Sequence, residues 1–348
     1  MKKLRFVELD LYKAILCMLV VFGHSITQSI RLNIVANNTF YILYTFHMPV
    51  FFIISGITYY NFERKYKLKD YFEKKVLRLI IPYVSITIFV YVVFNITSII
   101  LNNLINANLE FYNWRKIIQG LILSYSNIAK HLWFIYVLFI INIISKLLGT
   151  FIEKNKLMYI VISLILSVYA YRYTESEYSL IARVLYYNFY FQIGNMVLNS
   201  IFKNKNFIIN KLRFIVIFSS VFVVNNLLLL TLRNNNNLNQ TIKWFFLLVS
   251  TITIFNIILI LIEYCKNNKY FVEIFSIISK YNFEIYLLHN PFITLGSVTF
   301  LTKILNVTPI VAIVIGTILG IVIPIFISKY FIRKNKILKL IILGEKKI

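Results

Sequence analysis

Charged residues are scarce in this chain. Of its 348 residues, 14% are charged and 59% are hydrophobic, and the mean hydropathy is +0.75. Soluble domains carry about 25% charged residues, so the composition excludes an ordinary soluble protein. The same numbers exclude disordered, collagen-like and coiled-coil chains. The composition predicts an all-α, polytopic integral membrane protein.

Cysteine, glycine and histidine are also few. Cys17 lies in an apolar run and Cys265 at the end of a basic segment, so we expect neither a structural disulfide nor a cysteine metal cluster. The nine glycines are scattered and form neither a P-loop nor a G-x-G-x-x-G motif. The four histidines have no H-x3-H or H-E-x-x-H spacing, so no metal site is expected.

Acidic residues number only 13, against 37 Lys and Arg, which gives a formal charge of +24. In a soluble protein this excess would suggest nucleic acid as a partner. Here the cations lie in short stretches between apolar runs, where membrane topology and anionic lipid headgroups explain them. We therefore expect membrane lipid, and no nucleic acid, as a partner.

Long apolar runs account for most of the chain. A helix needs about 20 mostly apolar residues to cross a bilayer. Ten segments meet or nearly meet this length, namely 9–29, 40–60, 77–101, 131–149, 156–172, 183–201, 212–232, 242–264, 281–301 and 308–332. A further patch at 115–124 is too short and is expected to be interfacial or re-entrant. No soluble catalytic domain is recognisable, so we predict a single transmembrane domain over residues 1–348.

The Lys and Arg residues are distributed unevenly between the two ends of these segments. With the N-terminus in the cytoplasm, 28 of the 37 fall at cytoplasmic ends and nine fall outside. Cytoplasmic loops of membrane proteins are enriched in Lys and Arg. The count favours ten spans with both termini in the cytoplasm.

Ionisable residues inside the first apolar segment are costly in lipid and are therefore candidates for function. Lys13 and His24 are eleven positions apart, which places them on one face of a helix, separated by about 16 Å along its axis. Asp10 and Cys17 lie near the same stripe. The alternative is that Lys13 extends to lipid phosphate and His24 makes a helix contact.

The second segment carries another histidine at a similar expected depth. If its helix begins near Thr39, His47 lies about as far from the outer end as His24 does in the first helix. The two imidazoles would then contribute to one polar site, although His47 could also be a packing residue beside Pro49. Ser55 and Gly56 are interpreted first as a small-residue contact between helices.

Two further groups of ionisable residues have both a structural and a functional interpretation. Glu284 begins the ninth segment and His289 lies within it, and a structural role is open for both. Lys75 and Arg78 precede the third segment. They either mark the cytoplasmic interface or form a phosphate clamp for an anionic donor.

Five stretches of the chain follow one another in a recognisable order: FVELDLYKAILCMLVVFGHS (6–25), FHMPVFFIISGITYY (46–60), KKVLRLIIPY (74–83), HLWFIYVLFIINII (131–144) and NFEIYLLHNPF (282–292). Together they resemble the membrane acyltransferase-3 family, in its fucose 4-O-acetylase-like branch. In that family a basic residue precedes the catalytic histidine by ten intervening positions, and these two correspond to Lys13 and His24. The family more often has Arg there, so Lys13 keeps the charge but loses the planar fork that grips phosphate.

The resemblance implies an O-acyltransferase of the plasma membrane. The donor substrate would be an acyl-CoA, usually acetyl-CoA, and no permanently bound cofactor is expected. The acceptor would be a sugar hydroxyl of a cell-surface polysaccharide or of its lipid-linked precursor. Lys75 and Arg78 occupy the two basic places of a family element and would bind the donor. His24 would either take the proton of the acceptor hydroxyl or carry the acyl group covalently.

Two other classes of function remain open from the sequence. A glycan transporter or flippase would have the same composition, with many helices and polar residues inside them. A scaffold subunit of a glycan-assembly complex is a third possibility. The spacing of Lys13 and His24, together with the Lys75 and Arg78 pair, favours the enzyme, and acetyl transfer from a thioester would separate the three.

Overall fold

The structure, a computed structural model, describes residues 7–105, 112–123, 129–176, 179–198, 211–232 and 239–345. These residues are helical almost throughout, and no strand occurs among them. The all-α class predicted from the composition is therefore confirmed.

Helices of very different length make up the fold. They are α1 (Val7–Ser25), α2 (Ile34–Thr58), α3 (Leu68–Lys75), α4 (Ile81–Ile105), α5 (Trp114–Leu123), α6 (Trp133–Leu147), α7 (Gly149–Lys154), α8 (Lys156–Tyr171), α9 (Ser179–Gln192), α11 (Lys211–Leu232), α12 (Gln240–Cys265), α13 (Lys269–Lys280), α14 (Asn282–Leu288), α15 (Thr294–Lys303), α16 (Pro309–Ile327) and α17 (Lys336–Leu343). Short 3-10 turns are η1 (Ile30–Leu32) and η4 (Lys130–Leu132). The π-helical turns are η2 (Tyr59–Glu63), η3 (Val76–Ile80), η5 (Ile193–Leu198), η7 (His289–Ile293) and η8 (Ser328–Ile332).

Six helical stretches in the described part of the chain are long and apolar enough to cross a bilayer. They are Ile34–Glu63, Leu68–Ile100, Lys130–Leu147, Phe214–Leu232, Gln240–Cys265 and Pro309–Ile332. Lys156–Tyr171 is apolar but shorter. The chain is thus a multi-pass membrane protein, whereas the count of about ten spans and the cytoplasmic location of both ends stay predictions.

Helix α16 shows how these stretches meet both protein and lipid. Its small buried residues recur every four positions, at Ala312, Gly316, Gly320 and Pro324. A Cβ atom added at Gly320 would lie 2.7 Å from Cγ1 of Val21 in α1, so the two helices approach closely here. Large apolar side chains recur with the same spacing and are exposed, at Ile310, Val314, Ile318, Val322 and Phe326. One face therefore packs on the bundle and the other is suited to lipid.

Two of the predicted segments begin earlier than expected. Helix α2 starts at Ile34, because the side chain of Asn33 accepts hydrogen bonds from the backbone N–H groups of Val35 and Ala36 and so caps the helix. Helix formation before the third segment starts at Leu68 and continues through η3 into α4. The basic stretch that precedes this segment is therefore largely helical.

The ninth predicted segment is broken rather than continuous. Asn290 has extended backbone angles (φ −129°, ψ 149°) between α14 and α15. A residue before proline is disfavoured in the helical region, and Pro291 follows it. The break lies directly after His289.

Besides the short α7, two helices were not predicted, α13 and α17. Each is capped by an asparagine, Asn268 and Asn335 respectively, whose side chain accepts hydrogen bonds from the first turn. Their apolar residues lie on one face, so neither helix has the continuous apolar run by which a spanning segment is recognised. The patch predicted at 115–124 is also helical, as α5, and its interfacial or re-entrant position stays a prediction.

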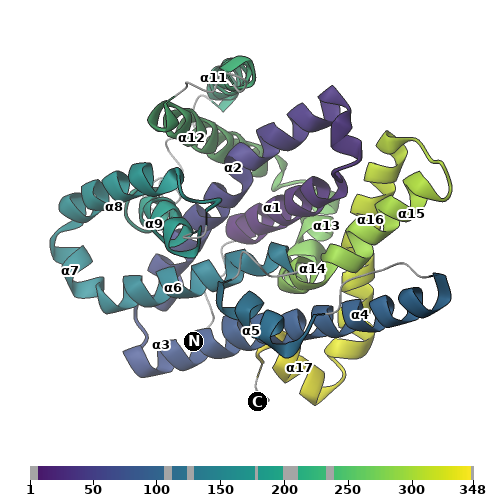
Figure 1. The fold of residues 1–348 in the computed structure, drawn as a ribbon. Helices are drawn as coiled ribbons and strands as arrows, with labels where there is room; N and C mark the ends of the chain where they lie inside the picture. The colour runs from purple at the N-terminus through teal and green to yellow at the C-terminus, as the bar shows by residue number, and fades with distance from the viewer. Residues whose placement is uncertain are drawn as a thin grey trace.

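Helix α1 lies at the centre of the bundle (Figure 1). It packs against α2, α12, α13, α14, α15 and α16, while α11 lies at the edge and packs on α12. Because neighbours surround α1, its polar residues face protein or internal cavities.

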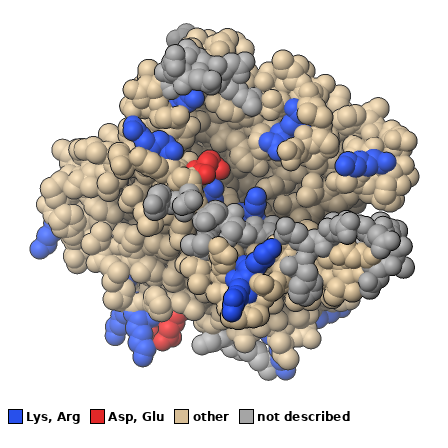
Figure 2. Space-filling model, viewed as in Figure 1, with Lys and Arg blue, Asp and Glu red and all other residues tan. Residues whose placement is uncertain are grey.

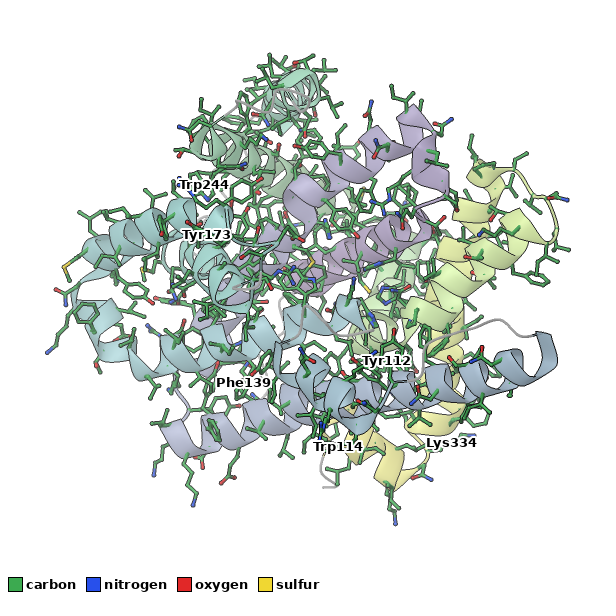
Figure 3. The ribbon with its side chains drawn as sticks, in the orientation of Figure 1. Tyr112, Trp114, Phe139, Tyr173, Trp244 and Lys334 are labelled. Atoms are coloured by element: carbon green, nitrogen blue, oxygen red, sulfur yellow. The ribbon has the colours of Figure 1, made fainter. Side chains whose placement is uncertain are left out.

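Helices α8, α9 and α12 form a second group, in which side-chain hydrogen bonds from α8 and α12 hold α9 in place. Trp244 of α12 points toward α8 and α9 (Figure 3) and its indole nitrogen donates to Oγ of Ser167 at 3.0 Å. The Ser167 hydroxyl in turn donates to the carbonyl of Tyr186 in α9, also at 3.0 Å. These two bonds tie together three helices.

Helix α9 and the π-helical turn η5 that follows it also approach α2 closely. A Cβ atom added at Gly56 would lie 2.9 Å from the backbone nitrogen of Asn195, and one added at Gly194 would lie 2.8 Å from the carbonyl carbon of Ile53. This is the small-residue helix contact that the sequence favours for Ser55 and Gly56.

Candidate functional site

Three histidines from distant parts of the sequence meet beside α1. His24 ends α1, His131 lies in η4 and His289 begins η7. The ring centroids of His24 and His289 are 5.1 Å apart, those of His131 and His289 are 5.4 Å apart, and those of His24 and His131 are 6.4 Å apart. We call these three residues the histidine cluster.

The break after α14 determines how His289 is held. Its ring nitrogen Nδ1 lies 2.9 Å from the carbonyl oxygens of both Ile285 and Tyr286. Both carbonyls belong to the last turn of α14, and the imidazole bonds to them where the regular helix ends. The other nitrogen, Nε2, is buried and has no hydrogen-bond partner among the described residues.

Tyr286 connects His131 to α14, the helix that directly precedes His289. The Tyr286 hydroxyl donates to the carbonyl oxygen of His131, and Nε2 of His131 lies 3.4 Å from the carbonyl oxygen of Leu287. Nδ1 of His131 is buried and, within the described residues, has no partner. Helix α14 therefore positions two of the three histidines, His289 as its neighbour in sequence and His131 through Tyr286.

A cavity of about 750 Å³ opens on the histidine cluster, and we call it the histidine cavity. His24 and His131 line it at one end. Its aromatic walls are formed by Tyr41, Tyr44, Trp133, Tyr171, Tyr186 and Tyr187. Its polar lining includes Lys130, Thr174, Glu175, Ser176, Ser179 and Arg183, which come from segments predicted to lie at the outer ends of the helices. In the space-filling view the surface is hollowed near its middle, with acidic and basic side chains beside the hollow (Figure 2).

Arg183 is the most firmly held charge in the histidine cavity. Its Nε donates to the carbonyl of Thr174 at 3.1 Å and its Nη2 lies 3.4 Å from Oε1 of Glu175. Its guanidinium carbon stands 4.9 Å from the centroid of the Trp133 ring. The Ser179 hydroxyl, also in the lining, is buried without a partner in the part of the chain that the structure describes. These groups can donate hydrogen bonds to a polar ligand.

His47 lines the histidine cavity but stands apart from the cluster. Its Nδ1 lies 2.8 Å from the carbonyl oxygen of Leu43, and its ring contacts that of Tyr44 with a centroid distance of 4.5 Å. The structure thus brings His24 and His47 to one cavity, without direct contact between their rings among the contacts found in the described residues.

A second cavity, of about 590 Å³, lies toward the other end of α1, and we call it the basic cavity. Its charged lining consists of Asp10, Lys13, Arg78, Lys280, Glu284, Arg333 and Glu345. Ser55 also lines it, although its hydroxyl is bonded to the Phe51 carbonyl at 2.8 Å. Among the residues that the structure describes, Tyr286 alone lines both cavities, so its side chain lies between them.

The structure separates Lys75 from Arg78. Arg78 lines the basic cavity, its side chain is 49% exposed, and its Nη1 pairs with Oε1 of Glu345 at 3.0 Å. Lys75 is not among the residues that line this cavity. Its Nζ forms an ion pair with Oε2 of Glu63 at 2.7 Å, and both side chains are nearly buried, at 12% and 14% exposure. Only Arg78 of the predicted pair faces the basic cavity.

Glu284 makes contacts typical of a structural ion pair. Its Oε1 accepts hydrogen bonds from Nε of Arg333 at 2.9 Å, from Nη2 of Arg333, and from the Ser328 hydroxyl at 3.0 Å. Residue Glu284 itself is 2% exposed. These bonds fasten α14, which carries Tyr286, to η8 and the residue after it.

Sequence reasoning missed His131 and Tyr286. Both fall inside stretches that resembled family elements, 131–144 and 282–292, and this was the available signal. His131 was compared with metal-binding spacings only, and that comparison cannot detect a cluster assembled from three separate segments. Among the described residues, no group of three His, Cys, Asp or Glu side chains has the arrangement needed to hold a metal ion.

The fold and the site define a class of protein: a multi-pass membrane protein with one polar cavity that reaches the histidine cluster and a second, charged cavity that shares Tyr286 with it. The family model of the acyltransferase-3 family, described as an acyltransferase domain, matches residues 6–329. The chain therefore belongs to the acyltransferase-3 family and is a membrane acyltransferase. No curated protein and no solved structure matches it.

Proposed function

We propose that this protein is an O-acetyltransferase of the plasma membrane, in the fucose 4-O-acetylase-like branch of its family. It transfers acetyl from acetyl-CoA to a sugar hydroxyl of a cell-surface polysaccharide or of its lipid-linked precursor. The observation that carries the proposal is the pair of cavities, which lie toward opposite ends of α1 and are both lined by Tyr286, with His24 in the lining of one and Lys13 in that of the other. Two substrates from opposite sides of a membrane need this arrangement.

The basic cavity is suited to the donor. Coenzyme A carries phosphates, and Lys13, Arg78 and Lys280 supply cations in the lining. Arg78 is half exposed, so a phosphate can replace Glu345 as its partner. The narrow pantetheine arm would extend from there toward Tyr286. By the sidedness of the Lys and Arg residues, this end of the bundle faces the cytoplasm, where acetyl-CoA is found.

The histidine cavity is suited to the acceptor. A sugar presents hydroxyl groups together with weakly polar ring faces, and the cavity presents tyrosines, Trp133, and the paired charges of Glu175 and Arg183. Aromatic side chains cover apolar faces, while planar charged groups form paired hydrogen bonds with neighbouring polar atoms. The acceptor hydroxyl would approach His24 from this cavity.

The reaction moves one proton from the acceptor hydroxyl to the leaving thiolate. In the direct route, an imidazole nitrogen of His24 takes the hydroxyl proton as the hydroxyl oxygen attacks the thioester carbonyl. The C–O bond forms, the C–S bond breaks, and the departing thiolate takes the proton from the imidazolium. In the covalent route, His24 itself attacks the thioester and then passes the acetyl group to the hydroxyl. Only the covalent route releases CoA and labels His24 before any acceptor is added.

Purified protein in oriented proteoliposomes tests the proposal. Acetyl-CoA supplied on the face that carries both termini is expected to give free CoA in the presence of acceptor, whereas acetyl-CoA on the opposite face gives none. His24→Ala is the control and is expected to abolish CoA release and the acetyl esters on glycans while leaving expression and membrane insertion near normal. Acceptor movement across the membrane without release of CoA would contradict the proposal and identify a transporter. Turnover by His24→Ala at the wild-type rate would remove His24 from the mechanism.

A further inference from the structure

His289 uses one ring nitrogen for structure and leaves the other free. Carbonyl oxygens only accept hydrogen bonds, so Nδ1, which lies 2.9 Å from those of Ile285 and Tyr286, carries the ring proton. Nε2 is then a bare acceptor. It is fully buried, since His289 is 0% exposed, and it has no partner within the described residues. An unpaired buried acceptor is costly unless it serves a ligand or a reaction.

Three rings surround His289, those of His24, His131 and Tyr286, and the Tyr286 hydroxyl already donates to the His131 carbonyl, which leaves the other two rings of the histidine cluster as candidate donors. In His131, Nε2 faces the carbonyl of Leu287 and so carries the proton, which leaves Nδ1 bare. Two bare ring nitrogens cannot bond to each other. His24 is the remaining ring, and a neutral imidazole always carries one N–H group. The donor that suits His289 is therefore His24.

The distance between the two rings agrees with this pairing. Their centroids are 5.1 Å apart. The two rings are therefore in contact, but no hydrogen bond joins them in this structure, and a rotation of the His24 ring would direct its N–H at Nε2 of His289. The rings are tilted by 53°, which permits an edge-to-edge approach.

We propose that His289 is a positioning residue for His24, an inference that rests on the function proposed above. When substrate binds, the His24 ring turns to donate its N–H to the unpaired Nε2 of His289, which fixes the tautomer and the orientation of the His24 ring. The other nitrogen of His24 is then bare and directed away from His289, ready to take the proton of the acceptor hydroxyl. A catalytic base that is oriented by a third group in this way is the general pattern of activated nucleophiles.

Two substitutions separate this role from a purely structural one. In His289→Asn, the side-chain amide nitrogen takes nearly the place of Nδ1 and still donates to the backbone carbonyls, but nothing replaces Nε2. In His289→Gln, the longer side chain brings an amide oxygen near the place of Nε2, where it can accept from His24, while the bonds to the carbonyls are weakened. The first variant keeps the structural bond and the second keeps the acceptor.

The readout is initial CoA release by the full chain in proteoliposomes, with kcat and both KM values determined. His289→Asn is expected to lower kcat by about 100-fold, the low end of the contribution of a positioned general base, with both KM values near those of wild type. His289→Gln is expected to retain more kcat than His289→Asn although its thermal stability is lower. A purely structural role would instead make the less stable variant the less active one.

Wild-type kcat in His289→Asn, or a lower kcat in His289→Gln than in His289→Asn, would overturn the positioning role. If wild-type protein releases no CoA from any acyl-CoA tested, the proposed function itself fails, and this outcome is distinguishable because it does not depend on the variants. If wild type turns over and His289→Asn does so equally well, only the role of His289 is lost.

Discussion

Substitution of Arg78 and of Lys75 should have different consequences, although the two residues are only three positions apart. Arg78→Ala removes a cation from the lining of the basic cavity. A hydrogen bond to a charged group contributes about 1.5–3 kcal/mol, and each 1.4 kcal/mol corresponds to about a tenfold change in affinity. Because Arg78 is 49% exposed and must first leave Glu345, we expect the lower end, a rise of about tenfold in the KM for acetyl-CoA.

Lys75→Ala should instead destabilise the protein. Its ion pair with Glu63 is nearly buried, and removing one partner of a buried pair costs about 3–5 kcal/mol. Lys74 lies 3.9 Å from Oε1 of Glu63 and the hydroxyl of Tyr71 lies 3.4 Å from Oε2, so part of this cost is offset. We expect a loss of about 2–3 kcal/mol in the free energy of unfolding, with little change in the KM for acetyl-CoA.

The two effects are measured on the same preparations. CoA release against acetyl-CoA concentration gives the donor KM at fixed acceptor, and thermal inactivation in detergent gives relative stability. Lys74→Ala is the matched control. The Lys74 side chain is 39% exposed and its Nζ lies 3.9 Å from Oε1 of Glu63, so its loss should change neither quantity appreciably. A tenfold rise in donor KM for Lys75→Ala with unchanged stability would refute the reasoning and return Lys75 to the donor site.

Two further predictions concern how the site is held. Glu284→Ala should lower the free energy of unfolding by about 1.5–3 kcal/mol, because it removes the buried carboxylate that bonds to Ser328 and Arg333, while Arg333, whose side chain is 29% exposed, keeps its bond to the Lys280 carbonyl. Thermal inactivation measures this, and a stability equal to that of wild type would show that the pair does not hold α14 in place. Gly56→Ala should cost about 1–3 kcal/mol through overpacking against α9 and η5, since the added Cβ atom meets backbone atoms there. Gly149→Ala is the comparison, because its Cβ would lie 4.0 Å from the nearest atom, the hydroxyl of Tyr59. Equal stability of these two glycine variants would contradict the close contact of α2 with α9.

Composition and hydropathy were sufficient to predict the class of fold. Apolar runs form helices in lipid because every backbone polar group must be bonded within its own segment, and this is a local property. For the same reason the predicted segments correspond largely to helices where the structure describes them, apart from the break at Asn290 and the end of α1 at Ser25. The positions at which helices start were predicted less accurately. Helix α2 begins at Ile34 because a single capping residue, Asn33, decides where it starts.

The candidate site was predicted only in part. Spacing along one helix is a local property, so Lys13 and His24 could be placed on α1 from the sequence, and the structure places one at each cavity. His131 could not be found in this way, because it reaches the cluster only through the packing of η4 against α14 and the bond from Tyr286. The same limit applies to the separation of Lys75 from Arg78, which depends on Glu63, a residue of the preceding π-helical turn η2.

The sequence by itself therefore determined that the chain is a helical membrane protein, that it resembles the acyltransferase-3 family, and that its first helix carries charged and imidazole groups on one face. Only the tertiary structure decided which groups meet. The break at Asn290 follows from Pro291, but its consequence, an imidazole held by two carbonyls with its free nitrogen near His24, requires α14 to pack against α1. Hydropathy reports what each segment gains from leaving water, whereas a site depends on which side chains packing brings within hydrogen-bond distance.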